Sequence, residues 1–128
     1  MTITPFLMFQ HGEAEEAMTF YLDTFQPSEL LNLKRHPEGN MAGKVMLAHF
    51  RIRGQTIAVS DSSVRHAFDF TPSMSLYVTC ENEADIQHIH DALAEGGQLL
   101  MPLDNYGFSR QFAWVQDRYG VSWQLTLE

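Results

Sequence analysis

FAWVQDRYGVSWQLTLE, residues 112–128, is the stretch that decides the fold of this chain. Alternating apolar and polar residues flank Asp117-Arg118-Tyr119-Gly120, which predicts two antiparallel strands joined by a tight turn. Gly120 suits the positive φ of a type I turn followed by a bulge. With that bulge, Trp114 pairs with Gln124 on the polar face of the hairpin. Without it, Trp114 instead meets Trp123 beneath a helix.

A second hairpin closes the first half of the chain. Its strands are expected at Lys44–Ile52 and Gln55–Ser60, on either side of Arg53-Gly54. A two-residue turn with glycine in second place pairs Ile52 with Gln55. The same register sets His49 opposite Ala58 and Arg51 opposite Thr56.

Each half also contains an extended segment, an amphipathic helix and a further strand before its hairpin. The first half has these at Thr2–Phe9, 13–25 and Glu29–Arg35, and the second at Met74–Cys80, Glu83–Glu95 and Gln98–Met101. The order β-α-β-β-β therefore occurs twice. It predicts an α+β fold in a single domain over 1–128, with a first module at about 1–62 and a second at about 73–128.

Every strand presents alternate residues to opposite faces of its sheet. One face of each module is consistently apolar and is the expected seat of the helix. The other face mixes aromatic, small and polar side chains, as the wall of a ligand cavity does. We call this second face the mixed face. Its candidate ligand-binding residues are Phe6, Met8, His49, Arg51, Ala58, Ser60, Ser75, Tyr77, Trp114 and Gln124.

The composition excludes several classes of function. The 128 residues include 16 acidic and 8 basic ones, for a net charge of −8, with no basic cluster for nucleic acid. A single cysteine excludes an intramolecular disulfide and a Cys-pair metal site. No segment has the length and hydropathy of a membrane span or the pattern of a signal peptide, so we expect a cytoplasmic protein.

Five motifs together resemble the vicinal oxygen chelate superfamily, which includes glyoxalase I, bleomycin-resistance proteins and extradiol dioxygenases. They are similar in particular to its PhnB-like branch, often labelled 3-demethylubiquinone-9 3-methyltransferase. The resemblance implies that the paired modules form an open barrel and that the protein is a homodimer with cavities near the subunit interface. The motifs are TPFLMF (4–9), AEEAMTFYLDTF (14–25), GQTIAVSDS (54–62), MPLDNYGFSRQ (101–111) and FAWVQDRYGVSWQL (112–125).

The resemblance also implies where a metal would bind. Metal-dependent relatives take one ligand from each of four strands, at places that correspond here to Phe6, Ala58 (or Ser60), Ser75 and Gln124. Divalent metals prefer imidazole, carboxylate or thiolate donors, and none of these residues supplies one. We therefore expect no metal and no cofactor. The methyltransferase label also lacks support, because the chain has no G-x-G turn for a conventional methyl donor.

Two functions stay open at this point. One is a metal-independent protein that binds a small, partly aromatic or apolar molecule, with Phe6, Met8, Tyr77 and Trp114 as stacking surfaces. The alternative is an enzyme of unknown reaction on a small organic substrate, of lyase, isomerase or dioxygenase type. In that case His49 is the candidate acid or base, and Gln124 or Ser75 orients the substrate. Arg51 is a candidate for an anionic substrate group. The same residues could equally be ordinary side chains that pack in the core or face solvent, without a function in binding.

Overall fold

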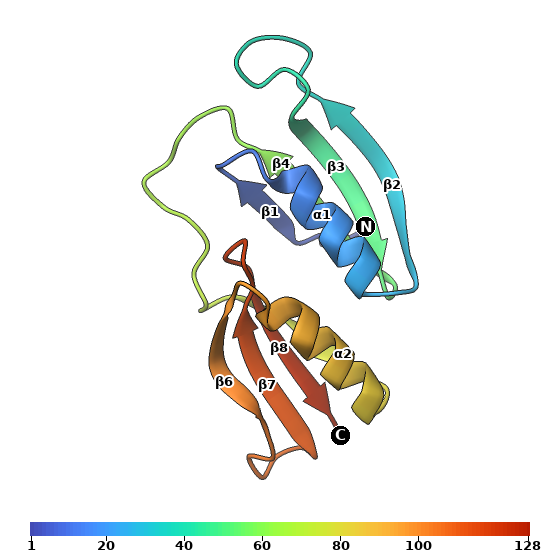
Figure 1. Cartoon of the computed structure of the whole chain (residues 1–128). Coiled ribbons are helices and arrows are strands. Elements are labelled where there is room, and N and C mark those ends of the chain that lie inside the picture. Colours follow the sequence, from blue (N-terminus) through green and yellow to red (C-terminus); the bar gives the residue numbers. More distant parts are fainter. The chain divides into compact units, whose positions relative to one another are not determined.

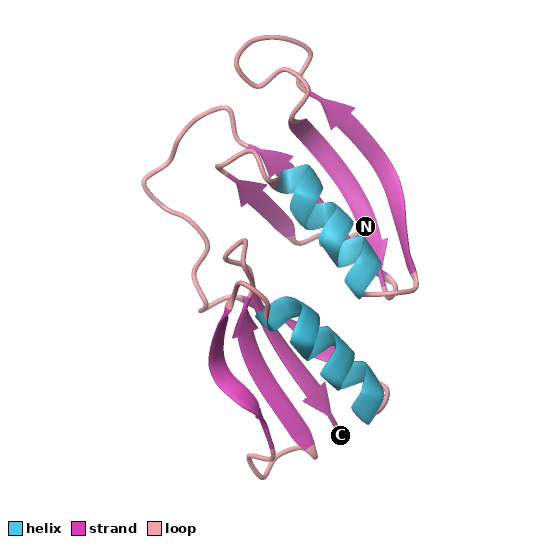
Figure 2. Ribbon diagram, in the orientation of Figure 1, coloured by secondary structure: helices cyan, strands magenta, loops and turns pink.

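The computed structural model describes residues 1–128, which divide into two compact units, Met1–Asp69 and Phe70–Glu128. Each unit contains one four-stranded sheet and one helix. Figures 1 and 2 show that in each unit the helix lies across one face of the sheet. The element order β-α-β-β-β occurs in both units, so the predicted α+β class and the doubled order are confirmed. Neither helix has the length and hydropathy to cross a membrane.

The first unit consists of β1 (Phe6–Phe9), α1 (Ala14–Thr24), β2 (Ser28–Arg35), β3 (Val45–Ile52) and β4 (Gln55–Asp61). Its sheet has the order β1-β4-β3-β2, with β1 parallel to β4 and the other neighbours antiparallel. Helix α1 lies across one face of this sheet (Figure 1). It buries the side chains of Ala14, Ala17, Met18 and Tyr21, which recur at helical spacing.

The second unit consists of β5 (Ser75–Thr79), α2 (Glu83–Ala94), β6 (Gln98–Asp104), β7 (Gln111–Gln116) and β8 (Ser122–Leu127). Its sheet has the order β5-β8-β7-β6, again with the first pair parallel. Helix α2 lies across one face of this sheet and buries Ile86, Ile89 and Leu93. Its N-cap is Asn82, whose side chain accepts a hydrogen bond from the backbone N–H of Asp85.

Both predicted hairpin registers are confirmed. Ile52 pairs with Gln55 across a turn in which Arg53 and Gly54 both have positive φ, of 47° and 85°. In the closing hairpin, Trp114 pairs with Gln124, and Gly120 has a φ of 93°. The bulged turn is therefore the correct alternative of the two, and Trp123 alone lies beneath the helix, 1% exposed.

The strand bounds differ from the sequence prediction by more than one residue in two places. Strand β1 begins only at Phe6, and the residues before it have no regular structure. Strand β6 continues beyond Met101, through Pro102, to Asp104. Proline lacks a backbone N–H, but β6 is an edge strand with register shifts on either side of Met101, where proline is tolerated.

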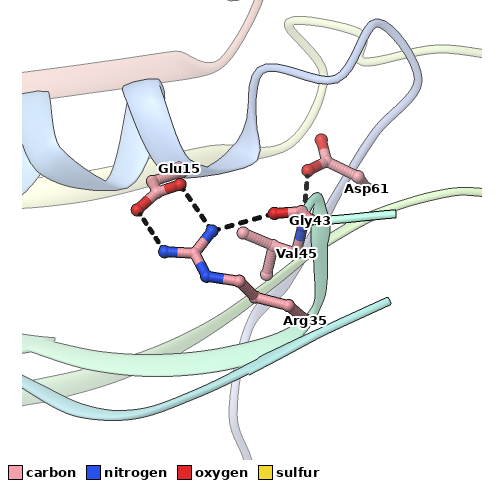
Figure 3. A network of polar contacts seen from close by, with 5 residues as sticks. All are labelled: Glu15, Arg35, Gly43, Val45 and Asp61. Atoms are coloured by element: carbon pink, nitrogen blue, oxygen red, sulfur yellow. Dashed lines mark hydrogen bonds and ion pairs between the residues drawn. The ribbon is translucent and has the colours of Figure 1, made fainter. Parts of the chain in front are cut away.

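Two acidic side chains connect α1 to its sheet. Figure 3 shows Glu15 paired with Arg35, and Asp61 bonded to Val45. Asp61, at the end of β4, accepts hydrogen bonds from the backbone N–H of Ala14 at 2.9 Å and from that of Val45 at 3.0 Å. Arg35 of β2 donates from both terminal nitrogens to the carboxylate of Glu15, each at 2.8 Å. These contacts mark the helix-covered face of the first sheet, so the mixed face is the opposite one.

The turn between β7 and β8 is built around Asp117. One carboxylate oxygen of this buried residue accepts hydrogen bonds from the backbone N–H of Tyr119 at 2.9 Å and of Val121 at 3.0 Å. The other accepts the indole N–H of Trp123, also at 2.9 Å. The side chain of Asp117 therefore fixes both the turn and the largest buried aromatic residue of the second unit.

Candidate functional site

The mixed face of the first sheet brings six of the predicted residues together. Residues directly opposite each other in a sheet share a face, and the register pairs Phe6 with Ala58, Met8 with Ser60, and His49 with Ala58. Arg51 lies two residues further along β3, opposite Thr56. Phe6 is 54% exposed, whereas Ala58 is buried beneath its neighbours. The face thus offers one open aromatic ring beside a flat, small-residue floor.

Two polar side chains from β2 complete this face. Nδ1 of His49 lies 3.0 Å from Oδ1 of Asn32, its strand neighbour. The guanidinium of Arg51 forms an ion pair with Glu29, the residue opposite it on β2. An amide oxygen beside Nδ1 favours the tautomer with the proton on Nδ1, which leaves Nε2 as an acceptor. Glu29 engages Arg51, so an anionic ligand must compete with this carboxylate.

The mixed face of the second sheet holds a connected hydrogen-bond network. Ser122 is its centre: its hydroxyl lies 2.6 Å from the hydroxyl of Ser75 and accepts the indole N–H of Trp114 at 2.8 Å. The side-chain amide of Gln124 donates to Ser75 at 3.3 Å. The carbonyl oxygen of Pro72 accepts from the hydroxyl of Ser122 at 3.3 Å. All four side chains are neutral, so the network can orient a polar group without supplying charge.

Tyr77 stands beside this network. It pairs with Gln124 on the same face, and 61% of its surface is exposed. An exposed phenol ring next to hydrogen-bonding amide and hydroxyl groups suits a ligand with a flat apolar part and a polar edge.

The register also shows which residue of β4 is equivalent to Gln124 of β8. Phe6 and Ser75 begin equivalent strands, since each lies eight positions before the first residue of its helix. In the second sheet Gln124 pairs with Tyr77, two residues after Ser75. The equivalent residue in the first sheet pairs with Met8 and is therefore Ser60. With this equivalence, the four places that the family resemblance implies are Phe6, Ser60, Ser75 and Gln124.

No group of three or more histidine, cysteine, aspartate or glutamate side chains in the chain is arranged to hold a metal ion. At the four corresponding places, phenylalanine has no lone pair to donate, and serine and glutamine are weak donors. The residues present do not fit a divalent metal of the glyoxalase type.

The sequence patterns did not identify Asn32, Glu29 or Ser122 as parts of the site. Ser122 alternates with Gln124 along β8 and so lies on the mixed face, but the approach of Trp114 and Ser75 to its hydroxyl depends on side-chain conformation. Asn32 and Glu29 lie on β2, whose register shifts between Leu30 and Asn32. A bulge moves the residues after it to the other face of the sheet, and no turn residue in the sequence of β2 indicates this bulge.

A separate cavity of about 190 Å³ lies in the first unit, between the end of β1 and the segment after β4. None of its lining residues is among those predicted for the site. Its lining residues are Gln10, His11, Arg65, His66, Ala67, Phe68 and Asp69.

Comparisons with known proteins place these features in context. The model of the family described as 3-demethylubiquinone-9 3-methyltransferase matches residues 1–126. A search of curated proteins found no significant match. Among solved structures, the chain is similar to a PhnB protein from Bacillus cereus, which carries the same methyltransferase description. Sequence identity is 50%, all of both chains is covered, and the TM-score is 0.95.

Two more distant structures extend the likeness. Protein PA1353 from Pseudomonas aeruginosa is 26% identical over 100% of this chain and 98% of its own, with a TM-score of 0.88. A glyoxylase/bleomycin resistance protein/dioxygenase domain from Frankia sp. EAN1pec is 14% identical. That match covers 99% of this chain and 90% of the other, with a TM-score of 0.69, and shows the fold alone.

Proposed function

We propose that this chain binds a small organic molecule without a metal ion. The chain belongs to the PhnB-like family described as 3-demethylubiquinone-9 3-methyltransferase, within the vicinal oxygen chelate superfamily. The ligand has a flat apolar part and at least one polar group. It is held by the mixed face of the second sheet. The proposal includes a homodimeric assembly and a cytoplasmic location.

The hydrogen-bond network of Ser75, Ser122, Trp114 and Gln124 is the observation that carries this proposal. Two of its members stand where metal-dependent relatives have ligands, yet here they bond to each other and to an indole. A metal site needs several lone pairs directed at one point, whereas these side chains form hydrogen bonds with one another. Such a neutral, connected network favours recognition of an uncharged polar group over Lewis-acid chemistry.

A thermal-shift screen of small aromatic and apolar metabolites, run with and without EDTA, tests the proposal. We expect at least one organic compound to raise the melting temperature equally in both conditions, because no metal takes part in binding. Stabilisation by a divalent metal, with none by any organic compound, would refute it.

Variants then place the ligand. Ser75→Ala and Gln124→Leu each remove a neutral hydrogen-bonding group from the network, so we expect the ligand to bind about 10-fold more weakly. Gln87→Leu, an exposed change on α2, which covers the opposite face of this sheet, is the matched control and is expected to leave the affinity unchanged. Equal affinities in all three variants would move the ligand elsewhere.

The contact between His49 and Asn32 favours one alternative, an enzyme that uses His49 as a general base. Nε2 of the tautomer set by Asn32 is free to accept a proton from a substrate. The test is a profile of turnover against pH for any compound that the screen identifies. Activity with a step near neutral pH that is lost in His49→Gln, and weakened in Asn32→Ala, supports the enzyme. Turnover that survives His49→Gln contradicts this role.

A further inference from the structure

The cavity after β1 combines a cationic side chain, two imidazoles and an aromatic wall. It is distinct from the mixed faces, and the proposed function makes no use of it. We infer that this cavity is a second binding site, for a small molecule that joins a carboxylate to a single flat ring.

The carboxylate is assigned to Arg65. The other lining cation sources are His11 and His66, but only Arg65 carries a permanent positive charge, and its guanidinium makes no hydrogen bond or ion pair within the chain. Guanidinium groups bind carboxylates through two parallel hydrogen bonds. In a chain with a net charge of −8, an arginine without a partner at the wall of a cavity is a specific place for an anion.

The flat ring is assigned to Phe68. Its side chain is 63% exposed, and the imidazole of His66 stacks on it with ring centroids 4.8 Å apart and an angle of 14° between planes. His66 thus covers one face of the Phe68 ring, and the exposed part of the ring is available to contact a ligand. Aromatic side chains of this kind pack favourably against a planar ligand.

The wall is held in place before any ligand arrives. The side chain of Gln10 donates to the carbonyl oxygen of Phe68, and its own amide oxygen accepts the backbone N–H of His66 at 2.7 Å. The hydroxyl of Ser62 lies 3.4 Å from Nε2 of His66. A preorganised loop costs less entropy on binding, which favours the recognition of a small ligand.

Asp69 is the one lining group that opposes an anion. Its carboxylate lies 3.5 Å from Nε2 of His11, and both side chains are more than half exposed. The His11 imidazole directs an N–H toward this carboxylate in one tautomer, which reduces its repulsion of a ligand. The volume of about 190 Å³ is below the roughly 300–1,000 Å³ of pockets for drug-sized molecules, so it suits a single ring.

The test is an NMR titration of the ¹⁵N-labelled full chain with sodium benzoate. Acetate, which lacks the ring, and benzyl alcohol, which lacks the charge, are the control compounds. We expect saturable shifts of the backbone amides of residues 10–11 and 65–69 with benzoate, and an affinity at least about 5-fold lower for each control compound. Shifts that do not saturate, or that centre on β5 and β8 instead, would overturn the inference. The second outcome would leave the proposed function standing.

Three variants assign the contacts. Arg65→Gln is expected to weaken benzoate binding about 10-fold, while Asp69→Asn strengthens it about 3-fold because one like charge is removed. Lys34→Gln is the matched control: it removes an exposed cation on β2 that also has no partner in the chain, and its affinity stays within about 2-fold of the unaltered protein. Equal losses in Arg65→Gln and Lys34→Gln would show only a general effect of charge. That result would overturn the site.

Discussion

Asp61 and Asp117 are the two buried acidic side chains of the protein, 2% and 3% exposed, and both accept hydrogen bonds from backbone N–H groups. Asp61 directly follows the predicted strand Gln55–Ser60, where an aspartate commonly stabilises a turn. Its partners Ala14 and Val45 are 47 and 16 positions away, so no local pattern reveals them. Asp61 instead connects the start of α1 to the start of β3.

Asp61→Ala is expected to lower the free energy of unfolding by about 2–4 kcal/mol, since two buried N–H groups lose their acceptor. Asp61→Asn keeps one acceptor oxygen but turns an N–H₂ group toward a donor, so a loss of about 1–3 kcal/mol is expected. Urea unfolding followed by circular dichroism measures both. Asp23→Asn, an exposed change on α1, is the control and is expected to stay within about 0.5 kcal/mol. A similar small change in Asp61→Ala would contradict the role given to this carboxylate.

At the scale of elements, strand registers could be predicted where a tight turn joins two neighbouring strands. Arg53-Gly54 and Gly120 fix the registers of their hairpins, and both registers were predicted correctly. The edge strands β2 and β6 have no such turns to fix them, and both contain register shifts. For that reason the far end of β6 and the contribution of Asn32 to the site were missed. Local sequence specifies a strand better when a tight turn joins it directly to its neighbour in the sheet.

Gly97, between α2 and β6, is expected to tolerate no side chain. A Cβ at this position would lie 2.3 Å from the carbonyl oxygen of Gln116 and 2.9 Å from that of Leu93. Because both atoms belong to the backbone, Gly97→Ala must shift the end of β7 or the end of α2. We expect a loss of about 2–4 kcal/mol of unfolding free energy by chemical denaturation.

Gly107→Ala is the matched control for that change. Gly107 has a φ of 97° but no atom within 4 Å of an added Cβ. Its substitution costs only backbone strain, about 1–2 kcal/mol. If Gly107→Ala proves as harmful as Gly97→Ala, close approach of the backbone is not the reason for glycine at 97.

The ion pair of α1 with β2 gives the first unit a dependence on pH. The pKa of Glu15 lies below its ordinary value of 4.5, chiefly because Arg35 donates hydrogen bonds to the carboxylate. A depressed folded pKa stabilises the protein above about pH 4.5 and loses that effect as the pH falls through the folded value. Glu15→Gln is therefore expected to flatten the dependence of stability on pH between about 5 and 3.

The effect of Glu15 is expected to be much smaller than that of Asp61→Ala, because half of the Glu15 side chain is exposed and salt screens it. Urea unfolding across this pH range, in low and in high salt, measures it. Glu38→Gln, in the exposed loop between β2 and β3, is the control. A Glu15→Gln curve that parallels the curve of the unaltered protein would mean that Arg35 does not act on this titration.

At the scale of the whole molecule, family and fold were recognisable because the motifs extend over almost the entire chain. The ligand was not, since neutral side chains such as Ser75 and Gln124 can recognise many polar groups. Large apolar side chains also remain exposed on the edge strands: Leu30 and Leu31 on β2, and Leu99 on β6. Exposed apolar edges are unusual in a protein that acts alone.

Sedimentation equilibrium is expected to give a mass close to twice the 14.6 kDa of one chain, in line with the proposed homodimer. A charge on an interfacial edge strand weakens association, so we expect Leu31→Lys to raise the dimer dissociation constant at least about 10-fold. Leu99→Lys makes the same change on the other edge strand and serves as the comparison. A loss only in Leu99→Lys would move the interface to β6, and a monomer at all concentrations would refute the dimer.

Cys80 is the only cysteine of the chain, and it is 5% exposed at the junction of β5 and α2. Its backbone N–H is bonded to the carbonyl oxygen of Thr126 at 2.8 Å. Thiol reagents reach a buried sulfur only when the surrounding structure opens. The rate at which Cys80 is alkylated therefore reports how often the structure around it in the second unit opens. A cysteine engineered at an exposed site reacts first, so a fluorophore or spin label can be attached there without removing the native thiol.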